Sequence, residues 1–401
     1  MKLAAGAFCS FMAVMSAGWA QAEVSLKLGV LNDRSGPYAD SGGEGSVVAA
    51  QLAIEDFKPA EKGIKVELIS ADHQNKPDIG SSIARRWYDQ EGVDVILDVP
   101  ISSVAFAVST LTREKNKILI ASGSGASEMT GSQCSPNTLQ FSYDTWSVSN
   151  STAKAVVERG GKSWYFISAD IAFGQALERD AAAAVKRAGG TVRGSSRSPM
   201  GTTDFSSYLL QAQTSGATVI GLANGTAEVR DSVKQAREFG IPQGGTKLAS
   251  LLIVINDVKG LGLEAGQGLL LTESFYWDLN ERTRAFSKRF ATRHGGRMPT
   301  MLQAGVYSGV LHYLKAIAST GTKESVAVLK AMKATPTDDD VFGAGYVRED
   351  GRKIHDMHLF EVKSPAESKG EWDLYKVLAS IPGEQAFRPM AEGGCPFVKA
   401  N

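Results

Sequence analysis

The 401-residue chain lacks the excess of one charge sign that nucleic-acid-binding proteins carry. Lysine and arginine together number 43, and aspartate and glutamate together also number 43. No basic stripe and no acidic tail interrupts this balance. Long apolar runs beyond the N-terminus are absent too, so no later segment is expected to span a membrane. The composition therefore argues against a nucleic-acid partner.

Motifs of catalysis and nucleotide binding are also missing. No G-x-S-x-G elbow surrounds a serine, and neither G-x(4)-G-K-[ST] nor G-x-G-x-x-G occurs. Only five histidines are present, and the one close pair, His355 and His358, falls three positions apart on a predicted strand. Side chains at that spacing point to opposite faces, which suits a metal ion poorly. We therefore expect no metal, no cofactor and no enzymatic activity.

The N-terminus carries the features of an export signal. Lys2 precedes a largely apolar stretch, and Ala20–Gln21–Ala22 has the small-x-small pattern that signal peptidase reads. Phe8 stands where a lipoprotein signal needs a small residue before Cys9, and the stretch is short for a retained membrane anchor. The sequence thus predicts a signal peptide over residues 1–22, cleaved after Ala22, and an exported protein.

Removal of this signal peptide leaves two cysteines, Cys134 and Cys395. In an oxidising compartment two cysteines favour one disulfide, and the alternative is a pair of free buried thiols. A bridge between them would stabilise the fold by at most about 4–5 kcal/mol in the chain-entropy model.

Short apolar or alternating runs separated by amphipathic segments organise the rest of the chain. This rhythm of strands and helices is typical of doubly wound parallel sheets. In the first half the patterns predict strands over 27–32, 65–69, 93–99, 117–121 and 138–143, and helices over 44–57, 77–90 and 104–115. In the second half they predict strands over 163–168, 191–196, 217–223, 248–255 and 268–275, helices over 173–188, 205–214 and 228–239, and a mostly helical stretch over 280–333.

Two α/β units follow one another without a low-complexity linker. Short crossings at 142–146, 272–277 and 343–346 replace it, and several short crossings are typical of two lobes joined by a hinge. The fold class is therefore α/β, with two doubly wound parallel-sheet lobes, a multi-strand hinge and a cleft. We predict lobe 1 over 23–143 plus 276–344, and lobe 2 over 144–275 plus 345–401, the latter with a C-terminal hairpin (354–362 and 372–378) and a tail.

Two neighbouring strand ends are rich in hydroxyls and glycines. The segments 98–103 and 121–127 each follow a buried strand, and the carboxyl ends of parallel strands form the crevice where ligands bind. Their O–H and N–H donors near helix N-termini suit a carboxylate, and simple N-capping of the helices is compatible with the same residues. The candidate ligand contacts here are Ser102, Ser103, Ser124, Ala126 and Ser127.

Aromatic and polar residues collect at further strand ends of both units. Each of them alone is more often part of a core than of a site, but together they look like the walls of an apolar slot. The candidates are Tyr143 at the first crossing, Phe173 at a helix start, Asn224 and Gly225 at a strand end, and Tyr276 and Trp277 at the second crossing.

The order and spacing of several motifs resemble a known family. These are 27–32 with Ser35–Ala39, Pro100–Ser103, Ala121–Thr130, Asp170–Gly174, and Asn224–Gly225 ahead of the helix 227–240. Over nearly the whole mature chain they resemble the periplasmic solute-binding proteins of ATP-driven importers, of the leucine/isoleucine/valine-binding (type I) kind. The resemblance implies a periplasmic monomer that binds a small solute between its lobes, closes by hinge rotation and delivers the solute to a membrane permease.

The resemblance also implies roles for site residues. The serines of the first two loops would grip a ligand carboxylate, and Phe173 would close from the other lobe. Members that bind amino acids pair the ligand ammonium with an acidic residue of the second lobe; Asp257 is the candidate here, although the sequence around it departs from the family pattern. Tyr143–Trp146, Phe275–Asp278 and the tail ending at Gly394–Pro396 resemble a subgroup with members associated with aromatic or other organic acids. Amino acid and aromatic carboxylate both stay open as ligands.

Two other functions compete with solute binding for import. A secreted serine hydrolase or amidase would use Ser102 or Ser124, but it needs a histidine beside the serine, and only His73 has a suitable strand-end position. A ligand-sensing partner of a membrane signalling protein would use the same fold and the same cleft.

Overall fold

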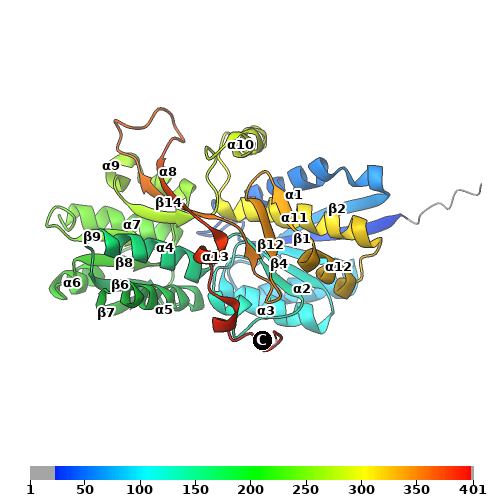
Figure 1. Cartoon of the computed structure of the whole chain (residues 1–401), viewed down its shortest axis with the longest axis horizontal. Coiled ribbons are helices and arrows are strands. Elements are labelled where there is room, and N and C mark those ends of the chain that lie inside the picture. The colour runs from blue at the N-terminus through cyan, green and yellow to red at the C-terminus, as the bar shows by residue number, and fades with distance from the viewer. Residues whose placement is uncertain (1–22, 399–401) are drawn as a thin grey trace, which may run out of the picture.

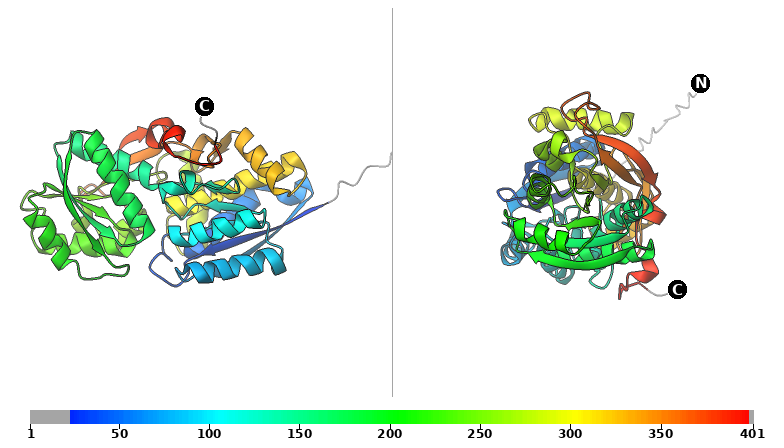
Figure 2. Two further views of the ribbon diagram at one scale, coloured as in Figure 1. Left: turned by 90° about the horizontal axis from the view of Figure 1, so that it is seen from below. Right: turned by 90° about the vertical axis from the view of Figure 1, so that its left-hand side faces the viewer.

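Two lobes, each built on a largely parallel sheet with helices packed against it, stand side by side in the computed structural model (Figure 1). The structure describes residues 23–398, so the predicted signal peptide and its cleavage after Ala22 lie outside the described residues. Seen from below, the chain beyond the last strands runs from one lobe to the other (Figure 2). This arrangement confirms the predicted α/β class with two lobes.

The first lobe contains a five-stranded parallel sheet in the order β2-β1-β3-β4-β5. Its central strands are buried on both faces, which explains their unbroken apolar runs. The strands are β1 (Val24–Asn32), β2 (Ile64–Asp72), β3 (Val95–Asp98), β4 (Ile118–Ala121) and β5 (Thr138–Gln140). The helices are α1 (Gly43–Phe57), α2 (Pro77–Arg86), α3 (Ser102–Glu114), α10 (Glu281–Arg293), α11 (Met301–Thr320) and α12 (Ser325–Ala334), with the short turns η1 (Pro59–Lys62), η2 (Trp87–Glu91) and η3 (Ser127–Thr130).

The second lobe contains a seven-stranded sheet in the order β15-β14-β10-β9-β8-β6-β7. Five strands are parallel, and the predicted C-terminal hairpin adds the last two in antiparallel fashion. The strands are β6 (Ser163–Ala169), β7 (Thr191–Ser198), β8 (Val219–Ala223), β9 (Lys247–Ser250), β10 (Leu270–Glu273), β14 (Met357–Val362) and β15 (Tyr375–Ile381). The helices are α4 (Thr145–Glu158), α5 (Ala172–Arg187), α6 (Ser206–Thr214), α7 (Thr226–Glu238), α8 (Ile255–Leu261), α9 (Leu263–Gly266) and α13 (Gly383–Ala386), followed by the turn η4 (Met390–Glu392).

A small antiparallel sheet lies on lobe 1, and because of it the chain crosses to lobe 2 later than the sequence predicts. It consists of β11 (Thr337–Asp339), β12 (Gly343–Val347) and β13 (Lys353–Ile354). Lys353 pairs with Asp339 at 2.9 Å, and Arg352 bridges to Gln140 of β5. The prediction that the chain crosses at 343–346 is therefore wrong, because that segment pairs within this sheet and the crossing follows Ile354. The remaining lobe boundaries stay a prediction.

Two further elements differ from the sequence pattern. Helix α4 is not among the predicted helices, because serine, threonine and small residues rather than an apolar stripe form most of its buried face. Strand β9 ends at Ser250 instead of at residue 255. The apolar residues that follow turn toward the space between the lobes, and α8 begins at Ile255.

The predicted disulfide is confirmed. Cys134 and Cys395 are bonded, with their Cα atoms 5.6 Å apart, and the bridge joins the loop before β5 to the C-terminal tail. Among the helices that the structure describes, none has the length and apolar character needed to cross a bilayer.

Candidate functional site

The turn between β3 and α3 adopts an unusual backbone conformation. Asp98, Val99 and Ile101 have φ angles of 78°, 51° and 69°, a region that β-branched residues rarely occupy. The buried carboxylate of Asp98 holds the turn by accepting hydrogen bonds from Asn32 Nδ2 at 2.9 Å and from Ser122 Oγ at 3.2 Å. Burial raises the pKa of this carboxyl. The turn places Ile101 in the wall of a pocket between the lobes.

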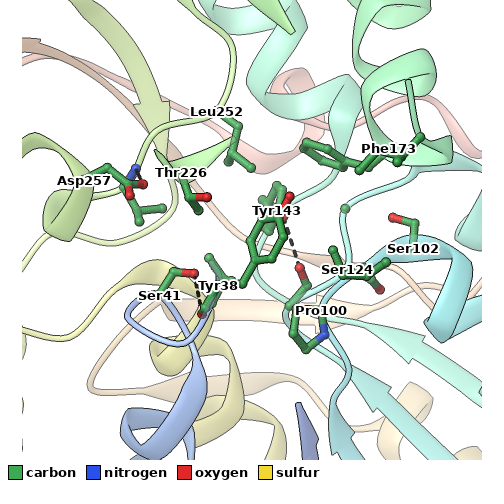
Figure 3. A pocket seen from close by; sticks show the side chains of 16 residues that line it. Tyr38, Ser41, Pro100, Ser102, Ser124, Tyr143, Phe173, Thr226, Leu252 and Asp257 are labelled. Carbon is green, nitrogen blue, oxygen red and sulfur yellow. Dashed lines mark hydrogen bonds between the residues drawn. The ribbon is translucent and has the colours of Figure 1, made fainter. Parts of the chain in front are cut away.

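This pocket lies at the carboxyl ends of the parallel strands and has a cavity volume of about 30 Å³. In Figure 3 Ser102 and Ser124 stand on one side, Thr226 and Asp257 on the other, and aromatic rings between them. The full lining consists of Tyr38, Ser41, Pro100, Ile101, Ser102, Gly123, Ser124, Gly125, Tyr143, Ile171, Phe173, Thr226, Leu252, Val254, Asp257 and Leu302.

The two serines lie at the N-terminus of α3 and in the loop after β4. Ser102 Oγ accepts a hydrogen bond from the backbone N–H of Ala126 at 3.1 Å, so its own proton remains free to donate. Ser124 Oγ donates only to Met129 Sδ, a weak acceptor, at 3.4 Å. Two hydroxyls beside the positive end of a helix can bind a carboxylate.

The aromatic walls require a glycine in the loop after β4. A Cβ atom on Gly125 would lie 2.5 Å from Tyr143 Cε2 and 3.0 Å from Phe173 Cε2. Tyr143 donates its hydroxyl to the carbonyl of Gly123 at 3.2 Å, which fixes the plane of its ring. Rings from the first crossing and from α5 therefore close on the same loop.

Tyr38 forms a third aromatic wall and is placed by a buried aspartate. Asp33 accepts hydrogen bonds from the backbone N–H groups of Gly36 at 2.7 Å and Tyr38 at 2.9 Å, and from Asn75 Nδ2 at 2.8 Å. This network shapes the turn after β1. Burial is the main cause that raises the pKa of the Tyr38 hydroxyl, so this side chain is neutral in the pocket.

Asp257 is the acidic residue of the lining and comes from the first turn of α8. Its Oδ2 accepts from the backbone N–H of Val254 at 3.1 Å, and its Oδ1 lies 3.7 Å from Arg230 Nη1. Burial raises the pKa of this carboxyl from 3.8 to about 6, against the opposing effects of the hydrogen bond and the arginine.

The lobes contact each other beside the pocket. Ser127 of η3 donates its hydroxyl to Asp180 of α5 at 2.7 Å. Asn256 of α8 donates to the carbonyl of Asp40 in lobe 1 at 2.7 Å. The structure is therefore a closed form, in which both bonds join one lobe to the other beside the pocket.

Of the predicted ligand contacts, the pocket brings together Ser102, Ser124, Tyr143, Phe173 and Asp257. Gly225 lies directly behind the lining, since a Cβ atom there would be 3.6 Å from Leu252 Cδ2 and 3.9 Å from Tyr38 Cε1.

Four other predicted contacts from the loops do not line the pocket. The backbone N–H of Ala126 donates to Ser102, and the hydroxyl of Ser127 donates to Asp180. The side-chain amide of Asn224 donates to Ser232 at 3.4 Å. Ser103 is half-buried on the next position of α3 and is absent from the lining.

The predicted pair at the second crossing also lies away from the pocket. Tyr276 Oη and Trp277 Nε1 both donate to the carbonyl of Trp372, at 3.2 and 2.8 Å. The Tyr276 ring packs 5.0 Å from that of Tyr375 and 5.6 Å from that of Phe360. The two residues join the hairpin to lobe 2, so their position does not support a role in ligand contact.

Most of the remaining lining residues were not predicted from the sequence. Tyr38 and Thr226 follow strand ends, the signal that identified the serines, and both could have been found in that way. Leu252 and Val254 were hidden in an apolar run that resembles a continuing strand. Leu302 carries no local signal, because it reaches the pocket from the start of α11, far away in sequence.

Neither pocket serine has a histidine partner. His73 is buried, and its Nδ1 accepts from the backbone N–H of Asn75 at 3.0 Å. The general base that a serine hydrolase requires is therefore not beside Ser102 or Ser124. Within residues 23–398 no group of three or more side chains is arranged to hold a metal ion.

Residues 25–371 match the family model described as periplasmic binding protein. The chain belongs to this family. Membership confirms the resemblance seen in the sequence and makes the chain a solute-binding protein of the kind that serves ABC transporters, not an enzyme. It also implies an exported, periplasmic protein.

Solved structures of this family share the fold over nearly the whole chain. A periplasmic binding protein from Burkholderia mallei is 45% identical, with a TM-score of 0.91 over 94% of this chain and 99% of the other. A branched chain amino acid ABC transporter periplasmic ligand-binding protein from Burkholderia xenovorans is 42% identical, with a TM-score of 0.85 over 93% and 99%. A solute-binding protein of an ABC transporter from R. palustris, in complex with 4-hydroxybenzoate, is 22% identical, with a TM-score of 0.82 over 90% and 98%.

Proposed function

We propose that this binding protein captures a small carboxylate-bearing solute in the pocket between its lobes. The lobes close on the solute by rotation about the three crossings, and the closed form delivers it to the membrane permease of an ABC importer. The equilibrium between open and closed forms shifts only as far as the solute prefers the closed form.

One observation carries this proposal: the pocket offers two weakly engaged hydroxyls, one at the N-terminus of α3 and one in the loop after β4, beside a wall that is largely apolar and aromatic. Ser102 and Ser124 would receive the carboxylate oxygens. Tyr38, Tyr143 and Phe173 would cover the body of the ligand and exclude water.

Two classes of ligand fit a pocket with hydroxyls on one side and aromatic rings beside them. An amino acid would place its ammonium against Asp257 and its side chain among the rings. An aromatic carboxylate would stack its ring between the aromatic walls and leave Asp257 with Arg230. The relative that is solved with 4-hydroxybenzoate and the branched-chain amino acid relative support one class each.

A thermal-shift screen of amino acids against benzoates and short-chain carboxylates separates the two classes. A tight ligand raises the unfolding midpoint by mass action. The Asp257→Asn variant then shows whether a ligand found in the screen uses this carboxylate. We expect loss of binding for an amino acid and little change for an aromatic acid. If no carboxylate shifts the midpoint, the proposed site is wrong.

Ser102→Ala combined with Ser124→Ala should weaken binding of the best ligand at least a hundredfold, because two hydrogen bonds to a charged group contribute about 1.5–3 kcal/mol each. Isothermal titration measures this. Ser103→Ala is the matched control, since Ser103 lies on the same helix turn outside the lining, and its affinity should match that of the unmodified protein. Equal losses in both variants would contradict the assignment of the two serines.

A further inference from the structure

The last segment of the chain leaves lobe 2 and ends on lobe 1 (Figure 2). Strand β15 belongs to the sheet of lobe 2 and ends at Ile381. The backbone N–H of Gly383 then donates to Asp356 Oδ1 at 3.2 Å, beside the third crossing. Beyond α13, Phe387 stacks on the guanidinium of Arg352 in lobe 1, 4.3 Å from its ring centre. The tail thus makes a fourth connection across the hinge.

Several contacts anchor the far end of this tail to lobe 1. The carbonyl of Arg388 accepts from Arg348 Nη1 at 2.7 Å, and Arg388 Nη2 donates to the carbonyl of Ser127 at 2.9 Å. A Cβ atom on Gly131 would lie 2.5 Å from Arg388 Nη2, so the tail and the loop after η3 pack closely. The disulfide of Cys395 makes the attachment covalent.

We propose that residues 382–395 form a strap that limits how far the cleft opens in the empty protein. A polypeptide of fixed length, covalently attached to both lobes, excludes the widest relative rotations of the lobes. The open form of a strapped protein therefore has fewer conformations than that of an unstrapped one.

The strap also reaches a contact that joins the two lobes beside the pocket. Ser127 receives Arg388 at its carbonyl while its hydroxyl donates to Asp180 of lobe 2. The residue that joins the lobes beside the pocket is thus held by the strap on its other side. Release of the strap frees the loop of η3 as well as the tail.

Distances between spin labels on the two lobes of the empty protein test this proposal. Lys65→Cys and Gln213→Cys place one label on each lobe at exposed positions, and the native cystine does not react with the label. When Cys134→Ser and Cys395→Ser are added, we expect the mean distance to lengthen and its distribution to broaden. The readout needs no ligand, so it is independent of the proposed function.

A second variant keeps the disulfide and lengthens the strap. Insertion of Gly-Ser-Gly-Ser between Ile381 and Pro382 leaves the contacts of Phe387 and Arg388 in place, and it should widen the distance distribution in the same way. This variant stays informative if loss of the disulfide impairs folding.

Val328→Ala controls for a general loss of stability. Val328 is fully buried in α12, away from the strap, so this variant should be less stable with an unchanged distance distribution. If the cystine-free and lengthened variants both give the distribution of the parent protein, the tail is only a local staple and the proposal is overturned.

Discussion

Asp257 shows how much a single residue of the pocket depends on its surroundings. In the unfolded chain its carboxyl ionises with a pKa near 3.8, whereas burial in the folded protein raises the pKa to about 6. The folded protein therefore binds the proton more tightly than the unfolded chain does. Between these two values stability falls as the pH rises, and above pH 6 the charged form costs up to about 3 kcal/mol.

Asp257→Asn removes this ionisation and keeps an oxygen that can accept the bond from Val254 N–H. We expect the variant to be more stable than the unmodified protein at pH 8, by up to about 3 kcal/mol, and nearly equal to it at pH 4. The loss of the contact with Arg230 reduces the gain. Urea unfolding of the empty protein at both pH values measures the difference.

Asp170→Asn, at an exposed position after β6, controls for the substitution itself. Stability differences that do not change between pH 4 and pH 8 would contradict the role assigned to the buried carboxyl of Asp257.

At the scale of elements, the start of α4 connects the hinge to the pocket. Asp144 caps the helix by accepting from Ser147 N–H at 2.7 Å, and it lies 3.8 Å from the buried guanidinium of Arg352. Arg352 in turn donates to the carbonyl of Tyr143 at 2.8 Å. Asp144 therefore stabilises the start of α4, and its negative charge balances that of Arg352. Arg352 in turn holds the backbone of the pocket residue Tyr143 in place.

Two variants of Asp144 separate these contributions. Asp144→Asn keeps an oxygen for the cap but leaves the charge of Arg352 unbalanced, which we expect to cost about 3 kcal/mol. Asp144→Ala loses the cap as well, for about 1 kcal/mol more. Chemical denaturation of both variants measures the free energies of unfolding. Identical values for the two variants would show that the cap contributes nothing.

At the scale of the whole molecule, closure depends on bonds that exist only when the lobes meet. The bond from Asn256 Nδ2 to the carbonyl of Asp40 joins α8 to the turn after β1 across the cleft mouth. Because opening the cleft must break this bond, it contributes to ligand affinity without any contact to the ligand.

Asn256→Ala should therefore weaken affinity for the best ligand of the screen about two- to tenfold, the value of one net hydrogen bond. Isothermal titration measures the affinity, and the unfolding midpoint of the empty protein should change little. Lys259→Ala on the same helix is the control, because Lys259 bonds to the carbonyl of Glu371 within lobe 2. If the control loses as much affinity as Asn256→Ala, the loss comes from α8 itself and not from closure.

Local patterns were sufficient for most of the elements and for part of the site. Apolar runs indicate the buried strands, and the hydroxyls of Ser102 and Ser124 lie where such strands end. Helix α4 was not predicted because small polar side chains form much of its buried face. The predicted strand extends beyond the end of β9 because, in the sequence, an apolar residue that faces the cleft cannot be distinguished from one inside a sheet.

The sequence by itself thus determined the α/β class, the two lobes, the disulfide and the family, since these follow from periodicity, composition and the order of motifs. Only the tertiary structure decided which strand-end residues share the pocket. The hydroxyl of Ser127 faces Asp180 and Tyr276 packs against the hairpin, whereas Tyr38 and Leu302 reach the pocket from distant segments. A side chain's partner depends on which lobe lies opposite it, and that is set by packing across the cleft rather than by its neighbours in sequence.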